Sequence, residues 1–335
     1  MRIGLSYDLK ESVSVSDGQP QDALEEYDSP ETVDALEAAL GSLGHQVIRL
    51  KGGRDFLDGI LREPVDFVFN ISEGLGNHRS REAQVPSVLE MLGIPYAGSD
   101  PQCLAICLDK PLTKSLVAAA GVSTPPWKVF TNRDQLRRIS WDGIAFPVFI
   151  KPAYEGSSKG ISGGCRKDNV SEAVECITRL LALYRQPVIV EEYVGGDEVT
   201  VGLVGNSPVR VIGVMRITPK ARASDFVYSL EVKRNWRNLV EYECPAAFED
   251  GIADRIVKSS VRIFDLLGCR DFARIDFRLD AGGAPNFLEI NPLPGLNPTE
   301  SDLSIMSSRL GILYPELVSS ILNAAVERYG RCVRR

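Results

Sequence analysis

One run constrains the fold of this chain more than any other: a hydrophobic strand that ends in a lysine and passes directly into a loop of glycines and hydroxyls. It reads Val148-Phe149-Ile150-Lys151-Pro152-Ala153-Tyr154-Glu155-Gly156-Ser157-Ser158-Lys159-Gly160-Ile161. Backbone N–H groups in a glycine-rich loop remain free to close around phosphate oxygens, and Lys151 adds a positive charge. In a Walker loop the lysine follows the glycines and a helix starts there, whereas here the lysine comes first. Taken alone, the run also fits an ordinary hairpin with a glycine turn.

Two runs near the other end of the chain, residues 273–280 and 286–292, alternate in the way of neighbouring strands with one buried face. The polar residues that share a face, two positions apart on each strand, are Arg274 with Asp276 and Glu289 with Asn291. Hard oxygen ligands of this kind suit magnesium, which binds through a few carboxylates plus substrate phosphates. These residues also fit a solvated sheet face, but Glu289 lies between two aliphatic residues, and a buried carboxylate needs a partner.

Four motifs, in this order along the chain, resemble those of the ATP-grasp ligases. They are Lys151-Pro152-Ala153-Tyr154-Glu155-Gly156-Ser157-Ser158-Lys159-Gly160, Glu191-Glu192-Tyr193 with Glu198 beyond it, Arg274-Ile275-Asp276-Phe277, and Glu289-Ile290-Asn291-Pro292-Leu293-Pro294-Gly295. Within that superfamily the chain is similar to the D-alanine:D-alanine ligases over nearly its whole length. The ordered set is far more specific than any single motif. The resemblance implies the ATP-grasp fold, which combines α/β and α+β units with an N-terminal open parallel-sheet domain of Rossmann-like type.

Composition and charge narrow the class of protein. The chain of 335 residues is 44% hydrophobic and 25% charged, which is typical of a globular protein with two or three domains. Its net charge of -7 argues against nucleic acid as an obligate partner, because binding a phosphate backbone requires a basic face. The chain starts with a short strand rather than a signal peptide, and no apolar run is long enough to span a bilayer. We therefore expect a cytoplasmic protein without a membrane partner.

The cysteines give a second indication of compartment. There are seven, an odd number without a C-x-x-C pair, which suits a reducing environment. Cys103 and Cys107 fall on one face of a predicted helix. Because the chain has only two histidines, His45 and His78, we do not expect a zinc site.

Three regions are predicted. Strands alternate with helices over residues 1–99, which indicates an open parallel sheet whose ligands bind beyond the carboxyl ends of its strands. This points to the loop 71–81, although its polar residues fit a solvated surface loop equally well. Residues 100–186 are predicted to form a compact α+β unit that carries the lysine strand. Residues 187–335 would supply a larger sheet with the metal and catalytic residues, and the polar segment 218–245 has the composition of a loop over the site.

The resemblance assigns nucleotide and metal contacts to single residues. Magnesium, or manganese in its place, would be held by Asp276, Glu289 and Asn291. The residues that would contact ATP, with Glu198 at the ribose hydroxyls, are Lys110, Lys151, Glu155, Gly156, Ser158, Glu191, Glu192, Val194, Glu198 and Lys233.

The resemblance also names catalytic positions. Arg274 and the backbone at Gly295 would stabilise developing negative charge, while Ser157 and Glu26 would face the amino acid substrates. Because water would destroy an acylphosphate, a mobile lid is expected, with residues 154–163 and 222–238 as its candidates.

The substrate-binding half departs from the family pattern at its start. D-alanine ligases carry a Glu-Arg-Glu-Val-Ser motif whose second glutamate anchors the ammonium of the first substrate, and this chain has Glu25-Glu26-Tyr27-Asp28-Ser29-Pro30 there. Glu26 and Asp28 are the candidates for that contact, with Tyr27 in the matching register.

Two further departures lie later in the chain. The family's lid motif Glu-Ala-Lys-Tyr is Glu231-Val232-Lys233-Arg234 here. The segment from Gly295 to Asp302 is longer than usual, which leaves Ser301 as a candidate for the second substrate's loop. The half that would bind ATP matches the family better than the half that would bind amino acids.

The resemblance implies a two-step reaction in which ATP phosphorylates a carboxylate and an amine then displaces the phosphate. The first hypothesis is a D-alanine:D-alanine ligase-like enzyme of peptidoglycan precursor synthesis, with small amino acids as its partners. The departures leave two alternatives, a ligase that joins other amino acids in a specialised pathway and a catalytically silent nucleotide-binding homologue. The family is often homodimeric through its first region, so a homodimer is a further expectation from the resemblance.

Overall fold

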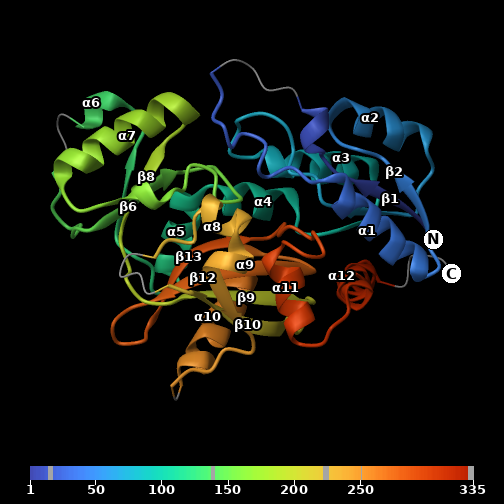
Figure 1. Ribbon diagram of the computed structural model, residues 1–335. Helices are drawn as coiled ribbons and strands as arrows, with labels where there is room; N and C mark the ends of the chain where they lie inside the picture. The colour runs from blue at the N-terminus through green and yellow to red at the C-terminus, as the bar shows by residue number, and fades with distance from the viewer. Residues whose placement is uncertain (14–17, 137–139, 222–225, 250, 331–335) are drawn as a thin grey trace.

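Three sheets organise the protein in the computed structural model, which describes residues 1–13, 18–136, 140–221, 226–249 and 251–330. One is a four-stranded parallel sheet, one a four-stranded antiparallel sheet and one a five-stranded antiparallel sheet. Figure 1 shows the small antiparallel sheet at the left, the parallel sheet at the right and the large sheet between and below them. This combination confirms the predicted fold class. No helix in the described ranges is long and apolar enough to cross a membrane.

The parallel sheet has the strand order β2-β1-β3-β4. Helix α1 begins at Pro30, because the Ser29 side chain accepts a hydrogen bond from the Thr32 N–H and the proline suits the first turn. The loop that follows β3 therefore leaves the carboxyl end of a parallel strand. The elements of this unit are β1 (Arg2–Ser6), η1 (Lys10–Ser12), α1 (Pro30–Ser42), β2 (Gln46–Arg49), α2 (Gly53–Arg62), β3 (Phe67–Asn70), η2 (Arg81–Ala83), α3 (Gln84–Leu92) and β4 (Tyr96–Ala97).

The small antiparallel sheet has the order β5-β8-β6-β7 and carries the lysine strand as β6. The predicted boundary at residue 186 placed β8 in the last region, but β8 lies between β5 and β6. The reason is packing, since Val188 and Val190 join the core beneath α7. The elements of this unit are β5 (Trp127–Phe130), α6 (Arg133–Leu136), β6 (Val148–Pro152), η3 (Gly163–Cys165), β7 (Arg166–Lys167), α7 (Val170–Tyr184) and β8 (Val188–Glu192).

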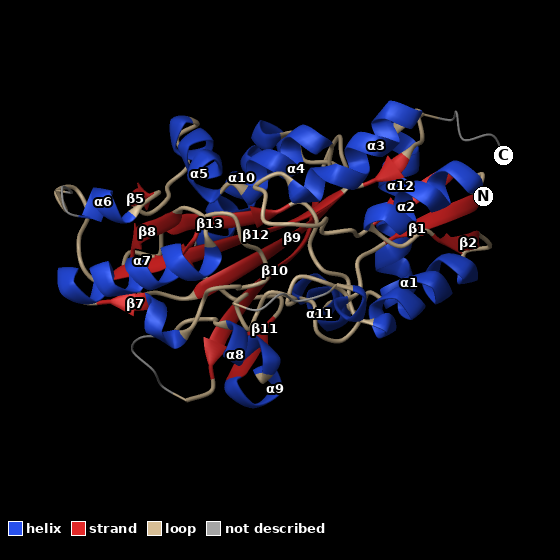
Figure 2. Cartoon of the chain, turned by 90° about the horizontal axis from the view of Figure 1, so that it is seen from above, coloured by secondary structure: helices blue, strands red, loops and turns tan. Residues whose placement is uncertain are grey.

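The large sheet has the order β11-β10-β9-β12-β13 and is covered on both faces. Helices α4 and α5, expected in the middle unit, pack with α10 on one face instead, where Cys103, Val117 and Ile263 share a core with the sheet. Figure 2 shows these helices on one side of the sheet and α11 on the other. The elements are α4 (Pro101–Leu108), α5 (Lys110–Ala119), β9 (Glu198–Val204), β10 (Arg210–Pro219), α8 (Leu230–Arg234), α9 (Trp236–Leu239), β11 (Val240–Glu243), α10 (Ile252–Leu267), β12 (Phe272–Leu279), β13 (Pro285–Asn291), α11 (Asp302–Arg309) and α12 (Tyr314–Arg328).

The register of β12 and β13 places the polar residues that the sequence singled out. Arg274 pairs with Asn291, and Asp276 pairs with Glu289, so all four share one face of the sheet. The apolar residues between them face the core under α10. The same polar face approaches α11 closely at Gly202, where an added Cβ would lie 2.7 Å from a side-chain atom of that helix.

Helix α12 fastens the parallel unit to the large sheet through one buried ion pair. Arg328 at its end donates to both carboxylate oxygens of Asp271, at 2.8 and 3.0 Å, and to the Tyr96 carbonyl at 2.9 Å. Asp271 is fully buried at the start of β12 and also accepts from the Gly98 N–H at 2.8 Å. The two units therefore share one satisfied charge pair.

Replacing Arg328 by alanine should lower the free energy of unfolding by about 3–5 kcal/mol, because it leaves a buried carboxylate uncompensated. The matched control is Arg49→Ala, since the Arg49 side chain also contacts two carboxylates but is 41% exposed, and surface pairs contribute less than about 1 kcal/mol. Urea denaturation followed by circular dichroism measures both. Equal losses in the two variants would show that the Arg328 pair does not join the units.

Candidate active site

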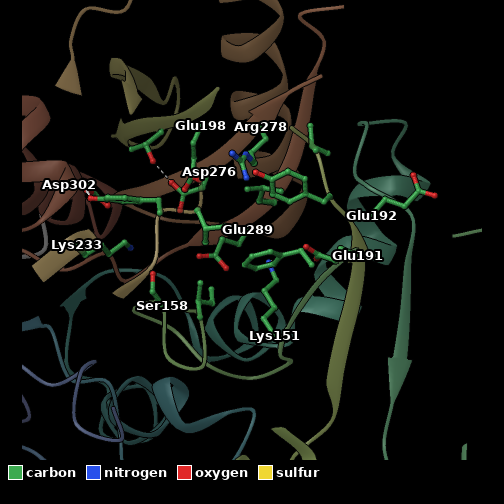
Figure 3. A pocket seen from close by; sticks show the side chains of 18 residues that line it. Lys151, Ser158, Glu191, Glu192, Glu198, Lys233, Asp276, Arg278, Glu289 and Asp302 are labelled. Carbon is green, nitrogen blue, oxygen red and sulfur yellow. Dashed lines mark hydrogen bonds and ion pairs between the residues drawn. The ribbon is translucent and has the colours of Figure 1, made fainter. Parts of the chain in front are cut away.

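A cavity lies between the small and large antiparallel sheets, and we call it the intersheet cavity. Figure 3 shows Lys151 and Glu191 at one wall, Glu198 and Asp276 at the opposite wall and Glu289 between them. The residues that line it are Phe149, Lys151, Ser158, Ile161, Glu191, Glu192, Tyr193, Val194, Glu198, Thr200, Val227, Tyr228, Lys233, Asp276, Arg278, Leu288, Glu289 and Asp302. The lysine strand and the two carboxylate strands, distant in sequence, thus meet at one place.

Glu191 is the centre of a buried ion-pair group at this wall. Its carboxylate lies 3.0 Å from the Lys114 ammonium and 3.2 Å from that of Lys151, and none of the three side chains is more than 5% exposed. Burial would lower the pKa of Lys151, but Glu191 and Glu289 raise it overall. Burial is the main reason that the pKa of Lys114 falls to about 8. Lys151 therefore presents a full positive charge to the cavity at neutral pH.

The large sheet supplies three carboxylates to the intersheet cavity, those of Glu198, Asp276 and Glu289. Burial would raise the pKa of Glu289, but the neighbouring cations, Lys110 first, lower it to about 2. The Lys110 ammonium lies 3.4 Å from its carboxylate. Burial raises the pKa of Glu198 to about 7. Two half-buried carboxyl groups on one wall thus differ strongly in the ease with which they ionise.

These residues fit a divalent cation. Asp276 and Glu289 are cross-strand partners, and Asn291 follows on the same face. Two carboxylates and an amide oxygen are the donor set that hard cations prefer. Thr200 donates a hydrogen bond to Asp276 from the neighbouring strand, which fixes the orientation of that carboxylate.

A second cavity of about 380 Å³ adjoins the first. The two share Lys233 and Asp302, and Arg274 lies at their junction, 2.9 Å from Asp276 and 3.3 Å from Asp302. The residues that line the second cavity are Lys10, Glu25, Glu26, Tyr27, Asp28, Ser29, Thr32, Ile71, Glu73, Glu82, Gly156, Ser157, Leu230, Lys233, Arg234, Arg274, Asn291, Leu293, Pro294, Gly295, Leu296, Asn297, Glu300, Ser301 and Asp302. A group bound in the second cavity therefore contacts this arginine directly, and the intersheet cavity is linked to it through Asp276 and Asp302.

A closed network of four charges forms the floor between the loop after β6 and the parallel unit. Arg81 lies 2.6 Å from Glu26 and 3.2 Å from Glu155, and Lys159 contacts the same two carboxylates. All four side chains are at most 6% exposed. Burial would raise the pKa of Glu26, but Arg81 and Lys159 lower it overall. The network holds two positive and two negative charges, so it is neutral as it stands.

The loop after β6 is held in an unusual backbone conformation. Ser157 and Ser158 both have positive φ, at 49° and 59°, which non-glycine residues adopt at a cost of about 1–3 kcal/mol each. The Gly160 N–H donates to Asp22 at 2.7 Å, and the Leu230 N–H donates to the Ile161 carbonyl at 3.4 Å. The two predicted lid segments thus contact each other, although residues 222–225 of the second one lie outside the described residues.

The remaining predicted residues either line one of the two cavities or contact residues beside them. Gly156, Ser157, Glu26 and Gly295 line the second cavity, as does Asn291. Lys110 lines neither but contacts Glu289. Glu155 also lines neither, because its carboxylate belongs to the four-charge network and only its carbonyl meets Lys110. The Glu192 side chain accepts from the Ala145 N–H and points away from the centre in Figure 3.

Several site residues were missed by the sequence analysis. They are Arg81, Lys114, Lys159, Thr200, Arg278 and Asp302. From the sequence, Lys114 and Lys159 would be expected to be solvated, because no nearby residue indicates their distant partners. Those partners are Glu191 and Glu26. Lys159 stands inside the quoted loop motif, so its charged side chain in an otherwise small-residue loop was the one available signal.

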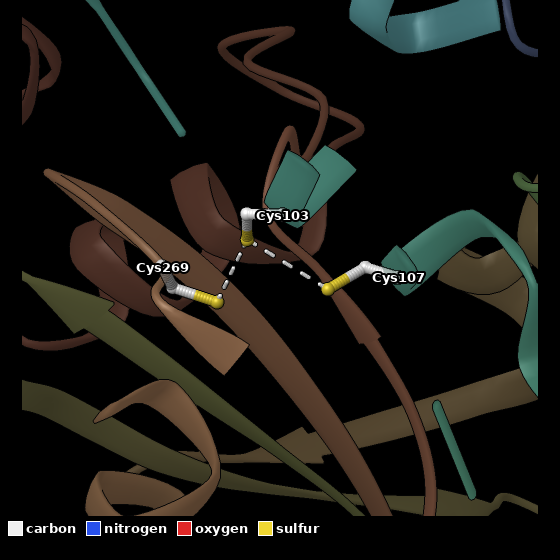
Figure 4. A group of neighbouring side chains, drawn as sticks. All are labelled: Cys103, Cys107 and Cys269. Atoms are coloured by element: carbon white, nitrogen blue, oxygen red, sulfur yellow. Dashed lines mark hydrogen bonds between the residues drawn. The ribbon is translucent and has the colours of Figure 1, made fainter. Parts of the chain in front are cut away.

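Cys103 and Cys107 share a helix face as predicted, and Cys269 joins them. The Cys103 sulfur lies 3.8 Å from that of Cys107 and 3.5 Å from that of Cys269 (Figure 4). All three are buried in the core between α4 and the large sheet. Since none of them lines either cavity described above, they act as core residues there.

Comparison with known sequences identifies the family. The family model described as the D-ala D-ala ligase C-terminus matches residues 116–323. The chain is 33% identical over 305 residues to the uncharacterized protein y4sG of Sinorhizobium fredii, with 88% of each chain covered. It is 32% identical over 295 residues to the D-alanine–D-alanine ligase of Aquifex aeolicus, covering 88% of this chain and 94% of the relative.

Solved structures agree on the fold. The D-alanine–D-alanine ligase of Bacillus anthracis complexed with ATP superposes with a TM-score of 0.74 at 21% identity, covering 98% of both chains. The VanG D-Ala:D-Ser ligase of Enterococcus faecalis superposes with a TM-score of 0.73 at 20% identity, covering 97% of this chain and 99% of that one. With the matched family model and the two sheets that meet around the lysine strand, these comparisons show that the chain belongs to the D-alanine–D-alanine ligase family and has the ATP-grasp fold.

Proposed function

We propose that the protein is an ATP-dependent ligase that joins two amino acids through an acylphosphate. The observation that carries the proposal is the position of Arg274, where the lysine-lined intersheet cavity and the second cavity meet. ATP would occupy the intersheet cavity, with its phosphates toward Lys151 and Lys233, and the amino acids would occupy the second. The names of the ligase relatives support D-alanine as the first substrate to test, and with it a place in peptidoglycan precursor synthesis.

The reaction has two balanced steps. An oxygen of the substrate carboxylate forms a bond to the γ-phosphorus while the bond to the bridging oxygen of ADP breaks. The nitrogen of the second substrate, as a neutral amine, then forms a bond to the acyl carbon. The acyl carbon–oxygen bond breaks, and the proton lost by nitrogen leaves with phosphate. Both steps bring negative charge to oxygens near the junction of the cavities, where a fixed cation has its greatest effect.

Arg274 is placed to meet that charge. Burial would lower its pKa, but Asp276 and Asp302 raise it overall, so the guanidinium stays protonated. Its planar fork is held by both aspartates before substrate arrives. The backbone N–H at Gly295, in the same cavity wall, is a second donor for the oxyanion. Catalysis would thus come from positioning and charge, with no covalent bond to the protein.

Magnesium is proposed as the metal, with Asp276, Glu289 and Asn291 as its ligands. The support is the cross-strand pairing of the two carboxylates and the hard oxygen donor set. When bound, the cation supplies positive charge against the phosphate oxygens. The protein's own lysines add to it from the opposite wall. A cytoplasmic location and a homodimer follow from the family and remain predictions.

Arg274→Lys should lower the rate of phosphate release by about 10²–10³-fold, as for removal of an oxyanion donor, while ATP binding changes little. Lysine keeps the charge for both aspartates but lacks the planar fork. Phosphate release with ATP, magnesium and pairs of D- and L-amino acids, beginning with D-alanine, measures the rate. Arg216→Lys, on the same sheet but outside both cavities, is the control.

No phosphate release from the unaltered chain with any amino acid pair, despite ATP binding by calorimetry, would contradict the proposed reaction. Equal rates for the two arginine variants would remove Arg274 from the catalytic role.

Lys151→Met should weaken ATP binding by about 10–100-fold, the effect of losing one charge-assisted hydrogen bond of about 1.5–3 kcal/mol. The fold should survive, because Glu191 keeps its pair with Lys114. Isothermal titration with a non-hydrolysable ATP analogue measures the dissociation constant. Lys128→Met, on strand β5 of the same sheet and outside the intersheet cavity, should bind normally. Unchanged affinity in the Lys151 variant would place the phosphates elsewhere.

A further inference from the structure

One wall of the second cavity carries carboxylates that the protein leaves without partners. Asp28, Glu73 and Glu82 all line this cavity. Within the described ranges, no hydrogen bond or ion pair is formed by the carboxylate of any of the three. They come from three separate segments, namely the approach to α1, the loop after β3 and the turn η2. Their convergence is therefore a property of the fold and not of one acidic run.

Glu82 is the clearest member of this group. It is only 8% exposed, and the part that remains accessible faces the second cavity. Burial raises its pKa to about 7, with Glu26 adding to the rise and Arg81 opposing it. Burial likewise raises the pKa of Glu73, and Glu82 is the first of the carboxylates that add to it. A buried carboxylate that is not hydrogen-bonded is costly, so a ligand that supplies a donor would be favoured here.

The cations of the second cavity are already committed elsewhere. Arg274 pairs with Asp276 and Asp302, and both Lys10 and Arg234 pair with Glu25. Lys233 lies 4.9 Å above the ring of Tyr228. Among the described residues, the cations that line the cavity are Lys10, Lys233, Arg234 and Arg274. None of them forms an ion pair with the three free carboxylates.

Glu26 is committed as well, which changes the expectation from the sequence. It was a candidate for the contact with a substrate ammonium. Its two oxygens lie 2.6 Å from Arg81 and 2.9 Å from Lys159. An ammonium that approached Glu26 would have to displace one of these buried cations. Asp28, the alternative candidate, is free, and it stands with Glu73 and Glu82 on the same cavity.

We propose that the second cavity selects an amino acid that carries an additional ammonium group, and that Asp28, Glu73 and Glu82 bind its positive charges. The proposal rests on the proposed ligase function and specifies the substrate class of that site as diamino carboxylic acids. Burial also raises the pKa of Asp28, to about 8, so these groups ionise most readily when a cation is bound beside them. An α-ammonium alone supplies one positive charge to three carboxyl groups. A second ammonium on the side chain supplies the hydrogen-bond donors that the remaining oxygens lack. D-Alanine is taken as the other amino acid of the pair.

The test compares substrates that differ only in that charge. Ornithine and norleucine have side chains of equal length in which an ammonium replaces a methyl group, and 2,4-diaminobutyrate and norvaline form a shorter pair. Each is offered in D and L form, with ATP, magnesium and D-alanine, and phosphate release is measured. We expect kcat/KM to be at least tenfold higher for the ammonium member of a pair. Equal or better use of the neutral members would overturn the proposal.

Variants test whether Glu73 and Glu82 cause the preference for substrates with a second ammonium group. Glu82→Gln and Glu73→Gln should each reduce the ratio of kcat/KM values between ammonium and methyl substrates by at least tenfold, with the KM for ATP unchanged. The control is Glu90→Gln in α3, since Glu90 lies outside the cavity and its contact with the Tyr96 hydroxyl is open to glutamine. Glu82→Gln replaces a buried acid, whose ionised form burial disfavours, by a neutral side chain, so its melting temperature should equal or exceed that of the unaltered chain. A preserved ratio in both glutamine variants would refute the assignment.

A binding measurement distinguishes failure of this inference from failure of the proposed ligase function. If no amino acid pair releases phosphate, ornithine is titrated calorimetrically into the full chain with an ATP analogue. Binding that is at least tenfold tighter than that of norleucine and is lost in Glu82→Gln supports the cationic site without the reaction. Turnover with neutral amino acids only supports the reaction without the site. Equal binding of ornithine and norleucine would overturn the inference whatever the reaction.

Discussion

The buried contact of Glu191 with Lys114 and Lys151 determines how the two antiparallel sheets face each other. Glu191 and Lys151 lie on neighbouring strands of the small sheet, whereas Lys114 comes from α5, which packs on the large sheet. Removing such charges from water costs several kcal/mol per ion, which is offset only when the geometry and further hydrogen bonds are good. Two lysines on one carboxylate leave a net positive charge. That excess faces the carboxylates of the large sheet across the intersheet cavity, where phosphate oxygens would find it.

Sequence alone predicted the residues whose placement depends on local periodicity. A strand has a period of two, so Arg274, Asp276, Glu289 and Asn291 had to share a face once their strands paired, and the observed register agrees. The parallel sheet followed from an equally local signal, the alternation of strands and helices. Partners distant in sequence were not predictable in this way. Arg81 meets Glu155 across 74 positions, and no pattern within either segment encodes the pairing. The unit boundary failed for the same reason, because β8 belongs to its sheet through core packing.

The junction of the cavities shows how a cation can be both restrained and available. Arg274 is held between Asp276 on its own strand and Asp302 at the start of α11. Asp302 also accepts from the Tyr228 hydroxyl at 3.0 Å, and that tyrosine lies under Lys233. The lid side of the site and the arginine thus share one carboxylate, that of Asp302. Such pre-organisation lowers the cost of reorienting dipoles as charge develops.

The four-charge network and the carboxyl groups of Asp28, Glu73 and Glu82 differ in whether the protein supplies their partners. Each acid of the network has a cation of the protein beside it, so the network is complete without a ligand. Glu82 has the opposite arrangement, and a buried carboxyl group without a hydrogen-bond partner lowers the stability of the empty fold. Buried polar groups without partners lower stability, and they occur mainly at sites where a bound ligand supplies the missing partner. A ligand that neutralises these groups stabilises the native state, and the effect grows with its affinity. Because the acids of the network already have cations beside them, the unpaired carboxyl groups that line the second cavity determine which ligand it selects.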